Sequence, residues 1–255
     1  MTVAAAIHRK LPDEDIIYLG DTARVPYGIK SRETITRYAL ESSLFLLSHK
    51  VKLIVVACNT VSAVALPYLR DILKAPLIGV LEPGVRAALS ELKSNLIGVI
   101  GTPSTIESGA YQNRIMELRN DVNVLSKACP LLVPLAEEGI TEGDIVNRIL
   151  AAYLETFDNG SIDVLILGCT HYPLFKPAIS QLLGEDVTLI DSAETTATEV
   201  ETMLLHERLI GTHGKGSVKC FITDVPRKFS KKAVLFFGSS LIEVKQQNIH
   251  DLHAE

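Results

Sequence analysis

Val164-Leu-Ile-Leu-Gly-Cys-Thr-His-Tyr-Pro-Leu174 carries the clearest structural signal in this chain. Its first five residues are apolar or glycine, a run too short for a helix and typical of a buried strand in a parallel sheet. Cys169, Thr170 and His171 follow, and Pro173 prevents the strand from continuing. Because open α/β sheets bind ligands at the carboxyl ends of their strands, the sequence predicts a reactive thiol at a ligand site.

A second stretch, Leu53-Ile-Val-Val-Ala-Cys-Asn-Thr60, has the same pattern. An apolar run ends in a small residue, then Cys58, then two polar residues. A single strand-end cysteine is more often an inert, buried structural residue than a functional one. Two cysteines in equivalent positions on separate strands, each followed by polar groups, favour a functional interpretation instead.

Composition limits the possible classes of protein. The chain has 255 residues, a hydrophobic fraction of 47% and a net charge of −5. These values are typical of a soluble globular protein and argue against an electrostatic nucleic-acid surface. No apolar run reaches membrane-spanning length and no signal-peptide pattern opens the chain, so we expect no membrane association and a cytoplasmic location.

The spacing of the four cysteines argues against two other uses of thiols. Cys58, Cys129, Cys169 and Cys220 are far apart, and no CxxC pair occurs. A zinc site is therefore not expected, and a reducing cytoplasm disfavours a disulfide. Cys129 and Cys220 are interpreted as structural residues. A thiol redox or zinc protein, the third possible class, would need closely spaced cysteines.

Predicted strands and helices alternate along the chain, so the expected fold is α/β with mainly parallel sheets. The two cysteine units suggest two similar domains with the site in the cleft between them. The first domain would comprise residues 1–82 and 192–255, and the second residues 83–191. A single helix is expected over about 61–74, the segment Glu82-Pro-Gly84 is expected to close a strand, and the polar last dozen residues are expected to fray.

A pair of thiols suits the transfer of a proton from one face of a carbon atom to the other. One thiolate would remove the proton and the opposite thiol would return one, since a cysteine pKa of about 8.5 makes both forms accessible. His171 is placed to tune Cys169, and Glu137 or Glu138 to orient the imidazole. Read alone, His171 is equally well a satisfied, partly buried histidine, and the two glutamates a solvated loop.

Neutral donors near both cysteines, such as Asn59 and several threonine hydroxyls, suit a carboxylate substrate. No Gly-rich phosphate loop is present, and no lysine has the context of a Schiff base. The sequence therefore predicts no cofactor and no bound metal.

Six motifs of this chain resemble the signatures of bacterial glutamate racemases, in matching order over nearly its whole length. They are Asp15-Ile-Ile-Tyr-Leu-Gly-Asp-Thr-Ala-Arg-Val-Pro-Tyr-Gly28, Val56-Ala-Cys-Asn-Thr60, Gly79-Val-Leu-Glu-Pro-Gly84, Val133-Pro-Leu-Ala-Glu-Glu-Gly139, Leu167-Gly-Cys-Thr-His-Tyr-Pro-Leu174 and Leu189-Ile-Asp-Ser-Ala193. The resemblance implies cofactor-independent interconversion of L- and D-glutamate, which supplies D-glutamate for peptidoglycan. Family members have two similar α/β domains and are commonly homodimers.

The resemblance also assigns roles to residues. Cys58 and Cys169 would be the two acid/base residues, and Glu137 and His171 would assist Cys169. The residues implied to contact the substrate are Tyr27, Gly28, Asn59, Thr60, Thr102, Thr105, Thr170 and His171.

One departure from the family pattern raises alternatives. The family opens with a strand and an Asp-Ser-Gly-x-Gly-Gly turn, and this chain begins where that turn would end. We therefore expect a missing central strand, serine and aspartate, a marginally stable sheet unless another segment fills the gap, and a natural product that starts upstream of Met1. The alternatives are a homologue that binds glutamate without turnover and an aspartate-specific racemase, although the glutamate-type motifs argue against the latter.

Overall fold

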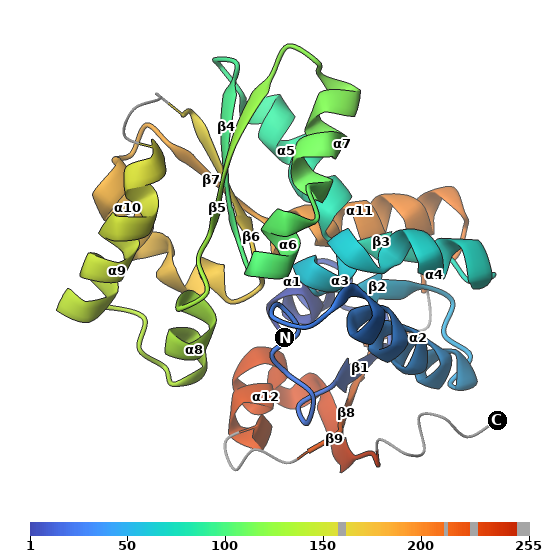
Figure 1. Ribbon diagram of the computed structural model, residues 1–255. Coiled ribbons are helices and arrows are strands. Elements are labelled where there is room, and N and C mark those ends of the chain that lie inside the picture. Colours follow the sequence, from blue (N-terminus) through green and yellow to red (C-terminus); the bar gives the residue numbers. More distant parts are fainter. Residues whose placement is uncertain (158–161, 212–213, 225–228, 249–255) are drawn as a thin grey trace.

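Helices and parallel strands alternate along the computed structural model, which confirms the predicted α/β class (Figure 1). The structure describes residues 1–157, 162–211, 214–224 and 229–248. Its α-helices are α1 (Thr2–Lys10), α2 (Arg32–Ser48), α3 (Asn59–Val64), α4 (Leu66–Ile72), α5 (Leu81–Glu91), α6 (Pro103–Glu107), α7 (Ala110–Leu118), α8 (Leu132–Glu137), α9 (Asp144–Leu154), α10 (Lys176–Leu183), α11 (Ser192–His206) and α12 (Phe229–Phe237). Short 3₁₀ turns occur at Glu155–Phe157, Tyr172–Phe175 and Gly238–Ser240.

The strands form three groups, and every pairing is parallel. The groups are β1 (Ile16–Gly20), β8 (Val218–Ile222) and β9 (Leu241–Gln246), in the order β1-β8-β9; β2 (Ile54–Val56) with β3 (Leu77–Gly79); and β4 (Leu96–Gly101), β5 (Asn123–Ala128), β6 (Val164–Gly168) and β7 (Thr188–Asp191), in the order β5-β4-β6-β7. The fraying expected over the last dozen residues is wrong at the start of that segment, because β9 extends to Gln246 and pairs with β8; residues 249–255 lie outside the described residues.

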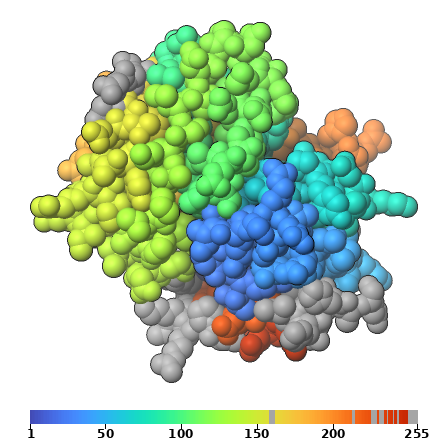
Figure 2. Space-filling model, viewed as in Figure 1, coloured from blue at the N-terminus to red at the C-terminus, as the bar shows by residue number. Residues whose placement is uncertain are grey.

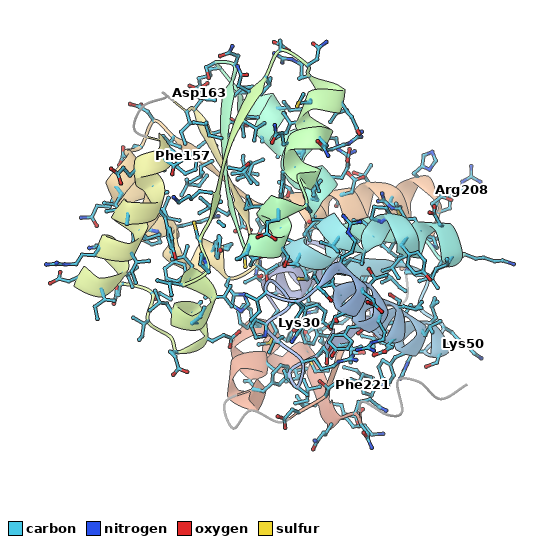
Figure 3. All side chains as sticks on the ribbon, viewed as in Figure 1. Lys30, Lys50, Phe157, Asp163, Arg208 and Phe221 are labelled. Atoms are coloured by element: carbon cyan, nitrogen blue, oxygen red, sulfur yellow. The ribbon has the colours of Figure 1, made fainter. Side chains whose placement is uncertain are left out.

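The four-stranded sheet positions the second cysteine. Strand β6 lies between β4 and β7, and all five of its residues are buried, as its apolar sequence predicts. Gly168 at its end pairs with Gly101 of β4. Asp163 lies at the opposite end of the sheet (Figure 3). Its carboxylate accepts a hydrogen bond from the backbone N–H of Lys93 at 3.0 Å. Helix α6, which follows the carboxyl end of β4, contacts α3, the helix that follows Cys58.

Strand β2, which leads to the first cysteine, pairs with β3 and not with β1. A cavity of about 1040 Å³ lies between β1 and β2 and is lined by residues of both strands. Helix α1 packs against α11, and their apolar side chains form one cluster with Ile78 and Val80. In Figure 2 the blue surface of the first 50 residues meets the green surface of residues 100–140, so these two parts of the molecule are in contact.

Prolines explain two differences from the predicted helices. The helix expected over 61–74 is two helices, α3 and α4, because Pro67 has no N–H to bond the preceding turn and is accommodated in the first turn of α4. Pro83 and Gly84, expected after a strand, lie in the first turn of α5 for the same reason. The domain boundary proposed at residue 82 falls within α5, and that at 191 falls between β7 and α11; both boundaries stay a prediction.

Candidate active site

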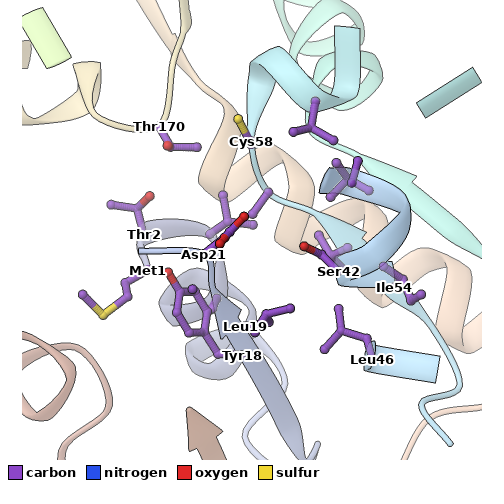
Figure 4. A pocket seen from close by; sticks show the side chains of 18 of the residues that line it. Met1, Thr2, Tyr18, Leu19, Asp21, Ser42, Leu46, Ile54, Cys58 and Thr170 are labelled. Carbon is purple, nitrogen blue, oxygen red and sulfur yellow. The ribbon is translucent and has the colours of Figure 1, made fainter. Parts of the chain in front are cut away.

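The two cysteines predicted to act together line the same cavity. Strand β2 ends two residues before Cys58, and β6 ends immediately before Cys169, so each thiol lies at the carboxyl end of a buried strand. Figure 4 shows Cys58 and Thr170 projecting toward one opening, with Asp21 at its lower side. The two strands belong to different sheets, and the cavity is therefore built where those sheets face each other.

The other residues predicted for the site gather around the same cavity, with one exception. Those that line it are Tyr27, Gly28, Asn59, Thr60, Thr102, Glu137, Thr170 and His171. Thr105 lies behind this lining, is 1% exposed, and hydrogen-bonds to Thr60 and Thr102. It can influence a ligand only through those two hydroxyls.

A thiol, an imidazole and a carboxylate form a chain on one side of the cavity. Cys169 Sγ lies 3.7 Å from His171 Nδ1, and His171 Nε2 lies 2.6 Å from Glu137 Oε1. Of the two glutamates left open by the sequence, Glu137 makes the contact. A carboxylate at the far nitrogen fixes the orientation of the ring. The arrangement can deliver a proton to the sulfur or accept one from it.

Burial raises the pKa of the Cys58 thiol, although hydrogen bonds from the Val61 and Thr60 backbone N–H groups and from the Thr60 hydroxyl oppose this. Burial, opposed by the backbone N–H groups of His171 and Tyr172 and assisted by a negative charge on Cys58, raises the pKa of Cys169 to about 12. Both groups are therefore thiols at neutral pH. Because their charges interact, removing a proton from one makes a second deprotonation harder.

Three threonine hydroxyls form a closed triangle beside Cys58. Thr60 Oγ1 lies 3.0 Å from Thr102 Oγ1 and 3.1 Å from Thr105 Oγ1, and the last two are 2.9 Å apart. Gly28 packs directly on this triangle, since a Cβ atom at that position would lie 2.5 Å from Thr102 Cβ. Ser104 holds the Gly28 carbonyl with its hydroxyl at 2.8 Å. Only glycine permits this approach of the loop.

The loop that carries Tyr27 is fixed by a buried charged network that was not predicted. The Asp21 carboxylate accepts hydrogen bonds from the Tyr27 hydroxyl, from Arg24 at 2.7 Å and from Thr223 at 2.9 Å. Arg24 also pairs with Glu41. Asp21 and Arg24 lie in the first of the six family motifs, but charged loop residues are usually solvated, so their burial gave no signal in the sequence.

Tyr111 is a second residue that the sequence did not indicate. Its hydroxyl donates to Asn59 Oδ1 at 2.6 Å, and both side chains are almost fully buried. Asn59 Nδ2 is buried without a hydrogen-bond partner among the described residues. Since the amide oxygen is held by Tyr111, the amide nitrogen is the group left to meet a ligand in the cavity. The two residues are 52 positions apart, which no local pattern reveals.

Membrane spans and metal clusters are both absent from the described residues. None of their helices combines the length and apolar character needed to cross a bilayer. Within the same residues, no three side chains of His, Cys, Asp or Glu come together as a metal site.

Comparison with known proteins identifies the family. The model of the Asp/Glu/hydantoin racemase family matches residues 1–200. The chain belongs to this family. It is 46% identical over 250 residues to the glutamate racemase of Geobacter metallireducens, which covers 98% of this chain and 93% of that protein. It is 48% identical to the glutamate racemase of Aquifex pyrophilus, over 88% of this chain and 85% of that protein.

A solved structure of the same family agrees with the fold. The crystal structure of glutamate racemase from Francisella tularensis in complex with D-glutamate matches with a TM-score of 0.91 and 38% identity. The match covers 98% of this chain and 94% of that one. The α/β architecture described above is therefore that of a solved racemase.

The contribution of the Tyr111–Asn59 hydrogen bond to the stability of the protein can be tested by substitution. In Tyr111→Phe, the buried Asn59 oxygen loses its donor, and we expect the free energy of unfolding to fall by about 1–3 kcal/mol. Tyr153→Phe is the matched control, because the Tyr153 hydroxyl bonds an exposed backbone N–H that water can satisfy. Urea unfolding of both variants gives the comparison, and equal effects would contradict the assignment of Tyr111.

Proposed function

We propose that this protein racemises glutamate by a two-thiol mechanism. The observation that carries the proposal is the pair of cysteines, Cys58 partly buried and Cys169 buried, each at the carboxyl end of a strand and lining one cavity. The similarity to proteins named glutamate racemase, at 46% and 48% identity, supports glutamate as the substrate rather than aspartate. By the same similarity, we propose a cytoplasmic homodimer that supplies D-glutamate for peptidoglycan.

In this mechanism one thiolate removes the proton from Cα of glutamate while the opposite thiol protonates the other face. Cys58 and Cys169 take these two parts, and they exchange them when the opposite enantiomer is bound. The products are the inverted amino acid and the same pair of one thiol and one thiolate with their states reversed. No group beyond the two sulfurs is needed to balance the protons, so the proposed reaction requires no pyridoxal phosphate, metal or ATP.

The remaining residues would bind the substrate and assist the acid and base. Asn59 Nδ2 and the threonine hydroxyls supply neutral donors for a carboxylate, and the Asp21 network holds Tyr27 and Gly28 at the cavity. His171, with Glu137 behind it, serves Cys169. Thr170 lies next to Cys169 in the lining.

The direct test is proton exchange in heavy water. Purified protein incubated with L-glutamate in D₂O should give D-glutamate with deuterium at Cα, with no loss of activity after treatment with a chelator. The same assay with L-aspartate tests the aspartate-specific alternative, and calorimetric titration with glutamate tests the alternative of binding without turnover. Binding without deuterium incorporation would reject the proposed racemisation.

Both cysteines are required in the proposed mechanism. We expect Cys58→Ser and Cys169→Ser each to reduce kcat by at least roughly a thousandfold, because a serine hydroxyl is a poor acid and base at neutral pH. Substrate binding should persist, since neither change removes the neutral donors. Cys129→Ser is the control for a buried thiol outside the cavity lining. Near wild-type racemisation in either site variant would exclude a two-thiol mechanism.

The raised pKa values of the two thiols predict a pH dependence. The active enzyme carries one thiolate, and the burial that raises the pKa of both groups keeps that form scarce at neutral pH. Between pH 6.5 and 8.5, kcat/KM should therefore increase by roughly tenfold per pH unit. A flat profile over this range would show that a thiolate is already present.

The range ends at pH 8.5 for a reason of stability. A thiol whose pKa is higher in the folded state contributes fully to stability below the unfolded pKa of about 8.5, and this contribution is lost as the pH rises through the folded value. Melting temperatures measured at each pH provide the control that the protein stays folded.

The partnership of His171 with Cys169 is tested by the direction of the reaction. By the family resemblance Cys169 acts on L-glutamate, so His171→Asn should reduce kcat more from the L than from the D enantiomer. The two enantiomers have equal free energies, and the two kcat/KM values must therefore fall together. Glu138→Gln is the control, because Glu137 makes the contact to His171. Equal falls in kcat in both directions would assign His171 a structural role.

A further inference from the structure

Tyr111 contacts a residue next to each of the two thiols. Its hydroxyl donates a hydrogen bond to Asn59 Oδ1 at 2.6 Å, and Asn59 immediately follows Cys58. Its ring lies against Gly168, which immediately precedes Cys169, because a Cβ atom added at Gly168 would lie 3.2 Å from Tyr111 Cε2. The side chain is 3% exposed and belongs to a buried cluster to which α3 and β6 also contribute. One tyrosine therefore joins the support of Cys58 to the support of Cys169.

The contact at Gly168 is with the backbone of β6 and not with a flexible side chain. The added Cβ atom would also lie 2.8 Å from the Ile100 carbonyl oxygen of β4, so this position accepts only glycine. Alternate residues of a strand face the same side of the sheet, and Ile166, two residues earlier, shares the buried cluster of Tyr111. Because close-packed interiors transmit displacements, a shift of the ring moves the chain directly before Cys169.

Helix α7, which carries Tyr111, is fixed to α5 by an ion pair. Arg114 lies three residues after Tyr111 and donates two hydrogen bonds to the Glu82 carboxylate, at 2.6 and 2.7 Å. Two parallel bonds between a guanidinium and a carboxylate fix the orientation of both groups. Helices α5 and α7 lie on the same face of the four-stranded sheet (Figure 1). Glu82 belongs to the motif Gly79–Gly84, and a Cβ atom at Gly84 would lie 3.9 Å from the Tyr111 hydroxyl oxygen, so this motif supports both α7 and the tyrosine.

We propose that Tyr111 is a positioning residue that sets the placement of the two thiols relative to each other. The proposal rests on the two-thiol mechanism above, in which Cys58 and Cys169 must reach opposite faces of one carbon atom at the same time. An error of about 1 Å in the position of a reacting group costs roughly a hundredfold in rate. The ring places Cys169 through Gly168, and the hydroxyl places the amide of Asn59 beside Cys58. Tyr111 itself does not line the cavity.

Two substitutions separate the two contacts. Tyr111→Phe keeps the ring and leaves the Asn59 amide unfixed, so KM for both enantiomers should rise roughly tenfold while kcat stays within about threefold of the wild-type value. Tyr111→Leu also removes the ring, and kcat should therefore fall roughly a hundredfold from both L- and D-glutamate. Steady-state kinetics in both directions, well below the melting temperature of each variant, gives these values.

Ile115→Ala is the matched control for a general loss of stability. Ile115 is fully buried in the same cluster on α7 and does not line the cavity. The cavity left by this substitution should lower the melting temperature, as Tyr111→Leu does, with kcat and KM within about twofold of the wild-type values. If Tyr111→Leu does not fold, Tyr111→Met fills the space with a flexible side chain and makes the same comparison.

Nuclear magnetic resonance tests both contacts without turnover. In isotope-labelled protein, the side-chain amide signals of Asn59 should shift in Tyr111→Phe and in Tyr111→Leu. The backbone amide signal of Gly168 should shift in Tyr111→Leu and stay close to its wild-type position in Tyr111→Phe. Both sets of signals should keep their positions in Ile115→Ala.

Two results would overturn the proposal. One is a Tyr111→Leu enzyme whose kinetics match those of Ile115→Ala, and the other is a set of Asn59 and Gly168 signals that no Tyr111 variant moves. Either result leaves the wild-type protein an active racemase. Failure of the proposed function has a different signature, because the wild-type protein itself would then not racemise glutamate.

Discussion

The placement of two thiols, Cys58 partly buried and Cys169 buried, at the carboxyl ends of two parallel strands is the constraint on which this site depends. A thiol in this setting resists ionisation, because the surrounding protein stabilises a charge poorly. Burial raises the pKa of both Cys58 and Cys169, and the charge of either one opposes that of the other. The site therefore favours states with at most one thiolate, which is the condition that a two-thiol proton transfer requires.

The surrounding structure keeps the two thiols different. Cys58 receives hydrogen bonds from the Thr60 hydroxyl and from backbone N–H groups at the start of α3. Cys169 instead lies beside the imidazole of His171, which Glu137 holds from the other side. One thiol is thus supported by neutral donors and the other by a titratable pair. Two similar strand ends have acquired unequal chemistry through the residues that pack next to them.

The cavity lies between two sheets that support the two cysteines to different degrees. The four-stranded sheet is continuous and its central strand is buried on both faces, so Cys169 stands on a rigid support. Strand β2 has three residues and a single neighbour, and β1 meets it only across the opening. The support of Cys58 therefore depends on helix packing and on the bonds of Ser62, which joins Val56 to Val80 at 3.0 and 3.2 Å. The packing around β2 therefore decides where the Cys58 thiol lies in the cavity.

The sequence by itself determined the α/β class, the two buried strands and the paired cysteines, because each of these depends on short runs of residues. It also indicated His171 and a glutamate partner, and it left Glu137 and Glu138 undecided. Only the tertiary structure decided that choice, the burial of Asp21 and Arg24, and the contact between Tyr111 and Asn59. Those features join segments far apart in the chain, and their energies come from burial and hydrogen bonding that no local pattern encodes.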